Sequence, residues 1–173
     1  MSVQLARAAA EKLVERLGIR KAPIDVEKIV QALGLRIVTV DLGDDVSGLL
    51  VSRKGMASIA VKQKDPPVRR RFTIAHEIGH FCLRHHLLGN ELVHTDEHRQ
   101  VIYRSPRASE GLDPLEIQAN QFAASLLMPT KLIRERVATL RKPLLEHDVK
   151  VLATEFRVSE QAMTIRLSTL GLL

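Results

Sequence analysis

The sequence has few of the features on which secreted and membrane proteins depend. Its one cysteine, Cys82, excludes an internal disulfide framework and fits a reducing compartment. The N-terminal residues soon reach charged side chains and lack the apolar stretch of a signal peptide. No apolar run approaches the roughly 18 residues that a membrane span needs. We therefore expect a cytoplasmic protein without a membrane partner.

Aromatic residues are also scarce, at 3% of the chain with no tryptophan, so the core is expected to be aliphatic. The contents of 45% hydrophobic and 27% charged residues are typical of globular proteins and argue against disorder. The net charge of +6 fits either a solvated basic surface or attraction to nucleic acid or an acidic protein. Composition does not decide between these two readings.

The order of the structural signals predicts an α+β fold. Apolar periodicity and caps predict helices over residues 3–17, 26–33, 68–86, 114–128 and 130–140, and a helix-turn-helix-like pair over 148–170. Short runs rich in Val, Ile and Leu predict a small antiparallel sheet over residues 35–42, 48–52 and 57–61. Asp25, Asp113, Thr130 and Ser159 are the predicted N-caps.

The long central helix contains the sequence His76-Glu77-Ile78-Gly79-His80. Residues four apart share a helix face, so His76 and His80 can direct two imidazoles at one metal ion. Glu77 lies about 100° further round the helix, where its carboxylate can accept a proton from a water that the ion activates. The apolar residues around the motif predict a buried helix, which argues against two surface histidines placed there by accident.

Two histidines require a third protein ligand. His86 lies six residues after His80, the spacing that metzincins use, but that arrangement needs a helix-breaking glycine where this chain has Leu83. If the helix continues through Leu83, His86 points away from the ion. We therefore interpret His85 and His86 as polar side chains near a helix C-terminus, where the helix dipole favours them.

Glu116 is the alternative third ligand, in the first turn of a separate predicted helix. Asn120 follows four residues later on the same face, where its amide oxygen can accept the spare ring N–H of a ligating histidine. The competing interpretation is an exposed glutamate that favours a helix N-terminus. Spacing alone leaves both interpretations open.

Two segments together resemble the ImmA/IrrE family of metallo-endopeptidases, zinc peptidases of the gluzincin-like type. They are Thr73-Ile-Ala-His76-Glu77-Ile-Gly-His80 and Glu116-Ile-Gln-Ala-Asn120-Gln-Phe-Ala-Ala-Ser-Leu-Leu-Met-Pro129. The resemblance extends from about Pro23 to near Leu170. In one respect the chain departs from many relatives, which carry a second glutamate where this chain has Gln118.

The resemblance implies a small zincin-like domain with Zn²⁺ held by His76, His80 and Glu116, and with Glu77 as the catalytic base. The sequence does not distinguish Zn²⁺ from Mn²⁺. The resemblance also implies that the protein substrate is a helix-turn-helix transcriptional repressor, encoded nearby, whose cleavage releases silenced genes. We expect one metallopeptidase domain over residues 1–173, with a catalytic core at 1–140 and a C-terminal helix pair at 141–173. Neither of the extra DNA-binding or sensor domains of some relatives is expected in it.

Two further expectations concern the substrate. Tyr103 and Arg104, with His94 and His98 behind them, are candidates for stabilising the oxyanion, in a poorly patterned loop over residues 87–112. The strand at 58–61 is a candidate sheet edge to which an extended peptide adds by backbone pairing.

The main competing function is a DNA-binding regulator, favoured by the basic charge and the C-terminal helix pair. The second helix of that pair is expected to present Glu160, Gln161, Thr164, Arg166 and Ser168 outward. Only one of these is a cation that can read bases, so direct DNA binding is disfavoured. A metal-binding interaction module with the same fold is the second alternative.

Overall fold

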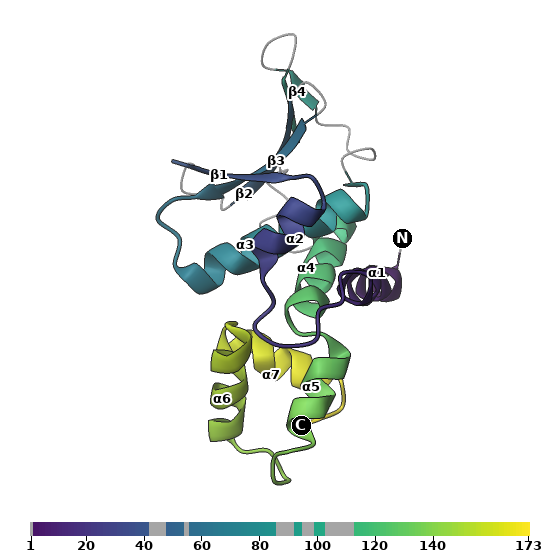
Figure 1. Cartoon of the computed structure of the whole chain (residues 1–173), viewed down its shortest axis with the longest axis vertical. Helices are drawn as coiled ribbons and strands as arrows, with labels where there is room; N and C mark the ends of the chain where they lie inside the picture. The colour runs from purple at the N-terminus through teal and green to yellow at the C-terminus, as the bar shows by residue number, and fades with distance from the viewer. Residues whose placement is uncertain (1, 42–47, 54–55, 86–91, 95–98, 103–112) are drawn as a thin grey trace.

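The computed structural model describes residues 2–41, 48–53, 56–85, 92–94, 99–102 and 113–173. Its helices are α1 (Val3–Arg16), α2 (Val26–Ala32), α3 (Pro67–Cys82), α4 (Pro114–Leu127), α5 (Thr130–Val137), α6 (Glu146–Phe156) and α7 (Glu160–Thr169). Its strands are β1 (Arg36–Val40), β2 (Gly48–Arg53), β3 (Met56–Lys62), β4 (Leu92–His94) and β5 (Arg99–Ile102). The fold is α+β and zincin-like, with the sheet at one end, α1–α4 in the middle and α5–α7 at the other end (Figure 1).

The strands of the described residues form one mixed sheet in the order β1-β3-β2-β5-β4. Every pairing is antiparallel except that of β1 with β3, which runs parallel from Arg36↔Ser58 to Val40↔Lys62. The expected sheet was antiparallel throughout. Strands β1 and β2 do run in opposite directions, but β3 lies between them, so they are about 10 Å apart. The chain between Val40 and Gly48 has enough residues to span that distance. Turn signals in the sequence do not distinguish such a connection from a tight hairpin between neighbouring strands.

Strand β3 is bordered by β1 on one side and β2 on the other. The expectation that residues 58–61 form a sheet edge open to a substrate is therefore wrong. Strand β3 is not an edge because β1 pairs with it in parallel. This pairing uses the backbone N–H and C=O groups that a substrate peptide would need.

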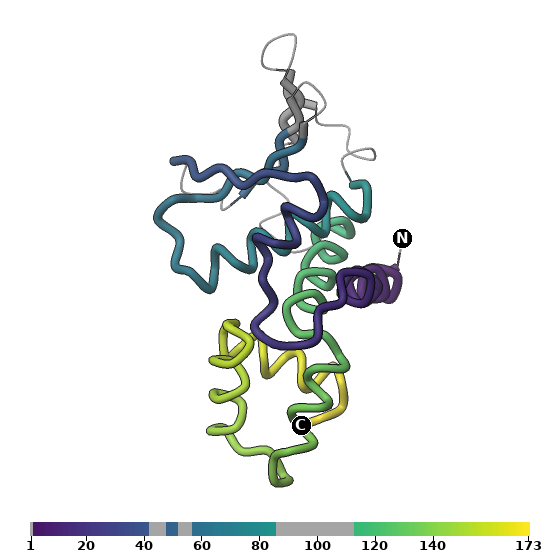
Figure 2. The backbone as a smooth tube through the Cα atoms, in the orientation of Figure 1, coloured from purple at the N-terminus to yellow at the C-terminus, as the bar shows by residue number. Residues whose placement is uncertain are grey.

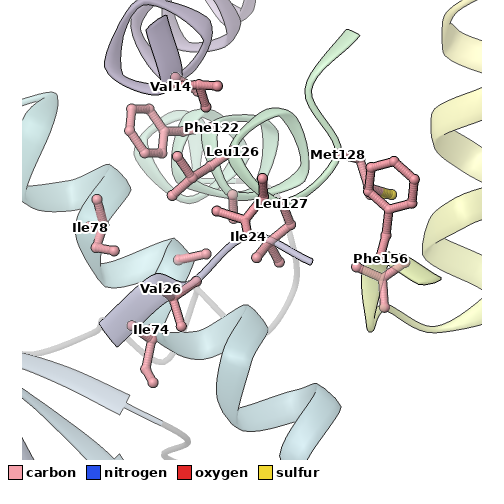
Figure 3. Packing of buried hydrophobic residues seen from close by; sticks show 14 of the residues in the cluster. Val14, Ile24, Val26, Ile74, Ile78, Phe122, Leu126, Leu127, Met128 and Phe156 are labelled. Carbon is pink, nitrogen blue, oxygen red and sulfur yellow. The ribbon is translucent and has the colours of Figure 1, made fainter. Parts of the chain in front are cut away.

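The aliphatic core lies where α1, α3 and α4 meet. Figure 3 shows Val14, Ile78 and Phe122, one from each helix, directed into a common cluster, and all three are buried. Along the tube in Figure 2, α1 and α4 lie side by side although they are far apart in sequence. This packing holds α4 against α3 and so positions the residues at the start of α4.

The C-terminal helices are joined to this core through Arg166 of α7, which is 4% exposed. Its Nε donates to the backbone carbonyl of Met128, and its Nη2 lies 3.2 Å from the carboxylate of Glu11 in α1. Thr130 also donates its backbone N–H and its hydroxyl to Glu11. One guanidinium therefore joins α1, α7 and the junction between α4 and α5.

Two sequence expectations are corrected by this junction. Arg166 does not point outward from α7, because its buried guanidinium is paired with the partly exposed carboxylate of Glu11. Thr130 is not the N-cap of α5, which begins at Thr130 after Pro129, because its hydroxyl donates to Glu11 instead. The predicted caps Asp25, Asp113 and Ser159 do accept backbone N–H groups at the starts of α2, α4 and α7.

Among the described residues, no helix combines the length and the apolar character that crossing a membrane requires.

Candidate metal centre

Helix α3 supplies two imidazoles that face each other. Pro66 and Pro67 open the helix, where the missing N–H groups cost nothing, and residues 73–79 are buried along it. The four-residue spacing places Nε2 of His76 2.9 Å from Nε2 of His80. When neither nitrogen carries a hydrogen, two ring nitrogens this close can direct their lone pairs at one metal ion.

Helix α4 brings a carboxylate to the same point. Its first turn is fixed by Pro114 and by Asp113, whose side chain accepts from the backbone N–H of Leu115 at 2.8 Å. Glu116 is the next residue after Leu115 and is 7% exposed. Its Oε2 lies 3.1 Å from Nε2 of His76, and its Oε1 lies 3.2 Å from Nε2 of His80.

Gly79 makes this approach of α4 to α3 possible. A Cβ atom built on Gly79 would lie 3.2 Å from the carbonyl oxygen of Ala119 and 3.2 Å from the ring of Phe122. Those distances are shorter than ordinary van der Waals contacts, so a side chain at this position would push the two helices apart. The glycine between Glu77 and His80 thus serves helix packing, a role that the sequence motif alone did not suggest.

The three donor residues fit a metal ion. One donor atom each from His76, His80 and Glu116 lies within 4.8 Å of the others. A tetrahedral zinc ion with bonds of 2.0–2.1 Å would separate neighbouring donors by about 3.3 Å. The two Nε2 atoms lie 2.9 Å apart, and each is 3.1–3.2 Å from a different oxygen of the Glu116 carboxylate, so these side chains could hold a metal ion after a small adjustment.

Asn120 supports one of these histidines from behind. Its Oδ1 lies 2.8 Å from Nδ1 of His76, the ring nitrogen opposite the one that faces Glu116. An amide oxygen only accepts, so this contact is a hydrogen bond in the tautomer that carries its hydrogen on Nδ1, and in that tautomer the lone pair of Nε2 is free to bind a metal ion. The structure thus places Asn120 in contact with His76, and its support of a metal ligand stays a prediction.

His85 contacts the other histidine, and sequence reasoning missed it. The predicted helix through residue 86 is wrong, since α3 ends at Cys82 and Arg84 adopts a left-handed conformation with φ of 57°. This conformation costs a non-glycine residue roughly 1–2 kcal/mol, and it turns the chain back toward the core. His85 is consequently 3% exposed rather than a polar side chain at the surface.

The environment of His85 is formed by His80 and Gln118. Its Nδ1 lies 3.0 Å from Nδ1 of His80, and its Nε2 lies 3.3 Å from Oε1 of Gln118. Burial, together with the smaller effect of the neighbouring His80, lowers the pKa of His85 to about 4, so the ring is neutral at pH 7. The signal that could have found this contact is Gln118 itself, a polar residue on a buried helix that needs a partner.

Glu77 follows His76 directly on α3, and it is 3% exposed. The start of β2 passes close to it. A Cβ atom built on Gly48 would collide with the methyl group of Thr73 and would lie 3.4 Å from Oε1 of Glu77. Gly48 therefore lets the sheet backbone approach the carboxylate directly, which the sequence analysis did not anticipate.

The structure does not describe most of the remaining candidates. Tyr103, Arg104, His98 and His86 lie outside the described residues, and His94 is the last residue of β4. The expectations for an oxyanion-stabilising side chain and for the metzincin-type ligand therefore stay predictions.

One family model and one solved structure resemble the chain. The family model of the IrrE N-terminal-like domain, Peptidase_M78, matches residues 30–168. A solved structure named "Mycobacterium tuberculosis transcriptional regulator" superposes with a TM-score of 0.63 at 22% identity, and this likeness concerns the fold alone. The match covers 95% of this chain but 46% of that one, so the chain spans about half the length of that regulator. No curated protein matches the sequence.

Proposed function

The chain belongs to the IrrE N-terminal-like Peptidase_M78 family, and from this premise we propose that it is a zinc-dependent endopeptidase that cleaves a helix-turn-helix transcriptional repressor. The observation that carries the proposal is the cluster of donor atoms from His76, His80 and Glu116, together with a buried carboxylate, Glu77, that follows His76 directly on the same helix.

His76, His80 and Glu116 are the proposed metal ligands. Two imidazole nitrogens and one carboxylate oxygen suit Zn²⁺, and Mn²⁺ is the alternative that such a donor set also accepts. When bound there, the ion supplies a Lewis acid that polarises a peptide carbonyl and makes a water molecule more acidic. Three protein ligands leave a coordination position open for that chemistry, as catalytic zinc sites require.

Glu77 is the proposed proton carrier. It follows His76 directly on α3, so its carboxylate lies beside the ligand set rather than within it. In this role it accepts a proton from the attacking water and then donates it to the departing amine. Its burial next to Gly48 excludes bulk solvent from the carboxylate, which limits loss of the proton between the two steps.

The proposed substrate is a protein that carries a helix-turn-helix motif and is encoded near this chain. The likeness to a structure named as a transcriptional regulator is consistent with a role in transcription, although that name belongs to the other protein. We further propose that residues 1–173 act as one domain, with 141–173 packed on the core at 1–140. The buried contact of Arg166 with Glu11 and Met128 supports this arrangement.

The decisive experiment mixes the zinc-loaded protein with the repressor encoded beside it and follows cleavage by gel and by intact mass. The unmutated protein is compared with Glu77→Gln, which keeps the shape of the side chain but cannot accept the proton. Loss of a general base costs about 10²- to 10⁴-fold in rate. The matched control is Glu135→Gln, at an exposed position of α5. Equal cleavage by Glu77→Gln and the unmutated protein, with equal zinc content, would refute the proposed base.

A regulatory module that binds DNA or protein, with a structural or vestigial metal site, is the alternative. The Ser159-capped α7 after a sharp turn at Arg157 favours it, since this pair has the form of a helix-turn-helix. However, the only cation of α7, Arg166, is buried, so this helix offers no positive side chain to a base edge. Absence of cleavage together with a salt-sensitive shift of duplex DNA would transfer the proposal to this alternative.

A further inference from the structure

His80 contacts a partner on each edge of its ring. Its Nε2 faces His76 and Glu116, whereas its Nδ1 lies 3.0 Å from Nδ1 of His85. The two nitrogens lie on different edges of an imidazole, so His85 sits behind His80 as seen from the other donor atoms. His85 is therefore not a fourth ligand, and its contact acts on His80 alone.

The direction of the hydrogen bonds in this chain follows from ligation. A neutral imidazole carries one ring hydrogen, and the nitrogen that binds a metal carries none. If His80 binds through Nε2, its hydrogen must be on Nδ1 and be donated to Nδ1 of His85. The hydrogen of His85 is then on Nε2, where it is donated to Oε1 of Gln118.

The opposite direction is incompatible with ligation through Nε2. If Gln118 presented its NH₂ group, Nε2 of His85 would accept and Nδ1 of His85 would donate to His80. His80 would then carry its own hydrogen on Nε2, the atom that faces His76 at 2.9 Å. The amide orientation of Gln118 thus decides whether the metal-facing lone pair of His80 is available.

We propose that His85 and Gln118 form a positioning chain that sets the tautomer and ring orientation of His80 for metal binding. This proposal rests on the proposed metal site. His76 has its acceptor at Nδ1 directly from Asn120, whereas His80 has its acceptor at Nδ1 from His85, which is in turn oriented by Gln118. Both ligand rings are then fixed by acceptors at Nδ1, one acceptor contributed by α4 and the other by the turn after α3. Neither acceptor is an acidic side chain.

The backbone supports this role. The left-handed residue Arg84 places His85 beneath α3, and the adjacent Leu83, which is 3% exposed, anchors the turn in the core. Gln118 is 4% exposed and reaches His85 from α4. An unfavourable backbone conformation kept beside two buried polar side chains is typical of a site where position matters.

The first test uses the unmutated protein, labelled with ¹⁵N at histidine and loaded with Zn²⁺. Ring nitrogens with and without hydrogen have well-separated ¹⁵N shifts, so each tautomer can be read directly. We expect the hydrogen of His80 on Nδ1 and that of His85 on Nε2. A hydrogen on Nδ1 of His85 would overturn the proposal, whatever the variants do.

The second test measures Zn²⁺ affinity by competition with a chelator. His85→Leu removes the acceptor and should weaken binding about ten- to hundredfold, the usual effect of losing such a partner. His85→Asn places an amide oxygen close to the position of Nδ1 and should restore most of the affinity. Gln118→Leu removes the other end of the chain and should also weaken binding. The control is His147→Leu, an exposed histidine of α6.

The outcomes separate this proposal from the function on which it rests. If the unmutated protein binds Zn²⁺ and His85→Leu binds it equally well, the positioning chain is refuted while the metal site stands. If the unmutated protein does not bind Zn²⁺, both proposals fail. If His85→Leu does not fold, Gln118→Leu and the ¹⁵N spectrum decide. Rescue by His85→Asn, measured at equal thermal stability of the metal-free proteins, separates positioning from a general effect on folding.

Discussion

A Cβ atom at Gly79 would lie 3.2 Å from the backbone carbonyl oxygen of Ala119. The backbones of α3 and α4 are therefore almost in contact, one residue before His80 on the first helix and one turn after Glu116 on the second. Because the ligands of the candidate metal site come from both helices, the distance between their donor atoms depends on this contact. Gly79 is thus as necessary for the geometry as the side chains that flank it.

We predict that Gly79→Val separates the two helices. The added side chain meets the rigid backbone of Ala119 and the ring of Phe122, so we expect a loss of about 1–3 kcal/mol in the free energy of unfolding. Zinc affinity should fall with it. Urea denaturation measures the first effect and chelator competition the second. The control is Ala8→Val, at an exposed position of α1, and equal behaviour of the two variants would contradict the packing role.

The identity of the third ligand is tested by Glu116→Ala and His86→Ala. The carboxylate of Glu116 lies 3.1 and 3.2 Å from the two Nε2 atoms, so its removal should abolish tight zinc binding. His86→Ala should retain zinc. Metal content after dialysis measures both variants. Retention by Glu116→Ala together with loss by His86→Ala would restore the metzincin-type arrangement.

Asn120 offers a test at the other histidine. Asn120→Leu removes the oxygen that lies 2.8 Å from Nδ1 of His76, and we expect about ten- to hundredfold weaker zinc binding. Asn120→Asp keeps an acceptor in the same place and should retain or increase the affinity. Isothermal titration with Zn²⁺ compares the two. Equal weakening by both substitutions would mean that the amide itself, and not its oxygen, matters.

Arg84→Gly should stabilise the protein. Glycine adopts a φ of 57° without the steric cost that arginine has there, and this gain exceeds the added entropy of the unfolded chain, for a net effect of about 1 kcal/mol. Thermal unfolding of the metal-free protein measures the change. Lys150→Gly, at an exposed helical position of α6, should change stability by about the same amount in the opposite direction. A lower melting temperature for Arg84→Gly would show that its side chain has a role of its own.

The reactivity of Cys82 should be low at neutral pH. Burial raises the pKa of its thiol from an ordinary value of 9.0 to about 11, although the charge of Arg16 partly opposes this. The thiolate fraction at pH 8 is then about a hundredfold below that of an ordinary cysteine. The rate of alkylation by iodoacetamide should therefore rise about tenfold per pH unit up to pH 10. The urea-unfolded protein is the control, and a plateau below pH 9 in the folded protein would contradict the shift.

The parts of the fold that local chemistry determines could be predicted from the sequence. Asp25, Asp113 and Ser159 each accept a backbone N–H at the helix start where they were expected. The spacing of His76 and His80 fixes their common face on any α-helix. Glu116 needed more than spacing, because its approach to the histidines depends on how two helices pack.

The rest could not be predicted because tertiary contacts override local preference. Leu83 favours a helix by propensity, yet α3 ends before it, since Leu83 and His85 are both buried by the turn at Arg84. Arg166 has the periodicity of an outward-facing residue, yet a distant carboxylate at Glu11 draws it inside. The parallel pairing of β1 has no local signal at all.

The ion pair of Arg166 with Glu11 has a consequence for the order in which the protein is completed. Glu11 is made early in synthesis and Arg166 near its end, so the contact forms only after almost the whole chain is available. A chain that stops before α7 leaves Glu11 and Thr130 without the guanidinium that joins them. Contacts of such long sequence separation form slowly. The polar junction between α1, α5 and α7 is therefore expected to close only at the last stage of folding, after α1 has packed on α4 through its apolar side chains.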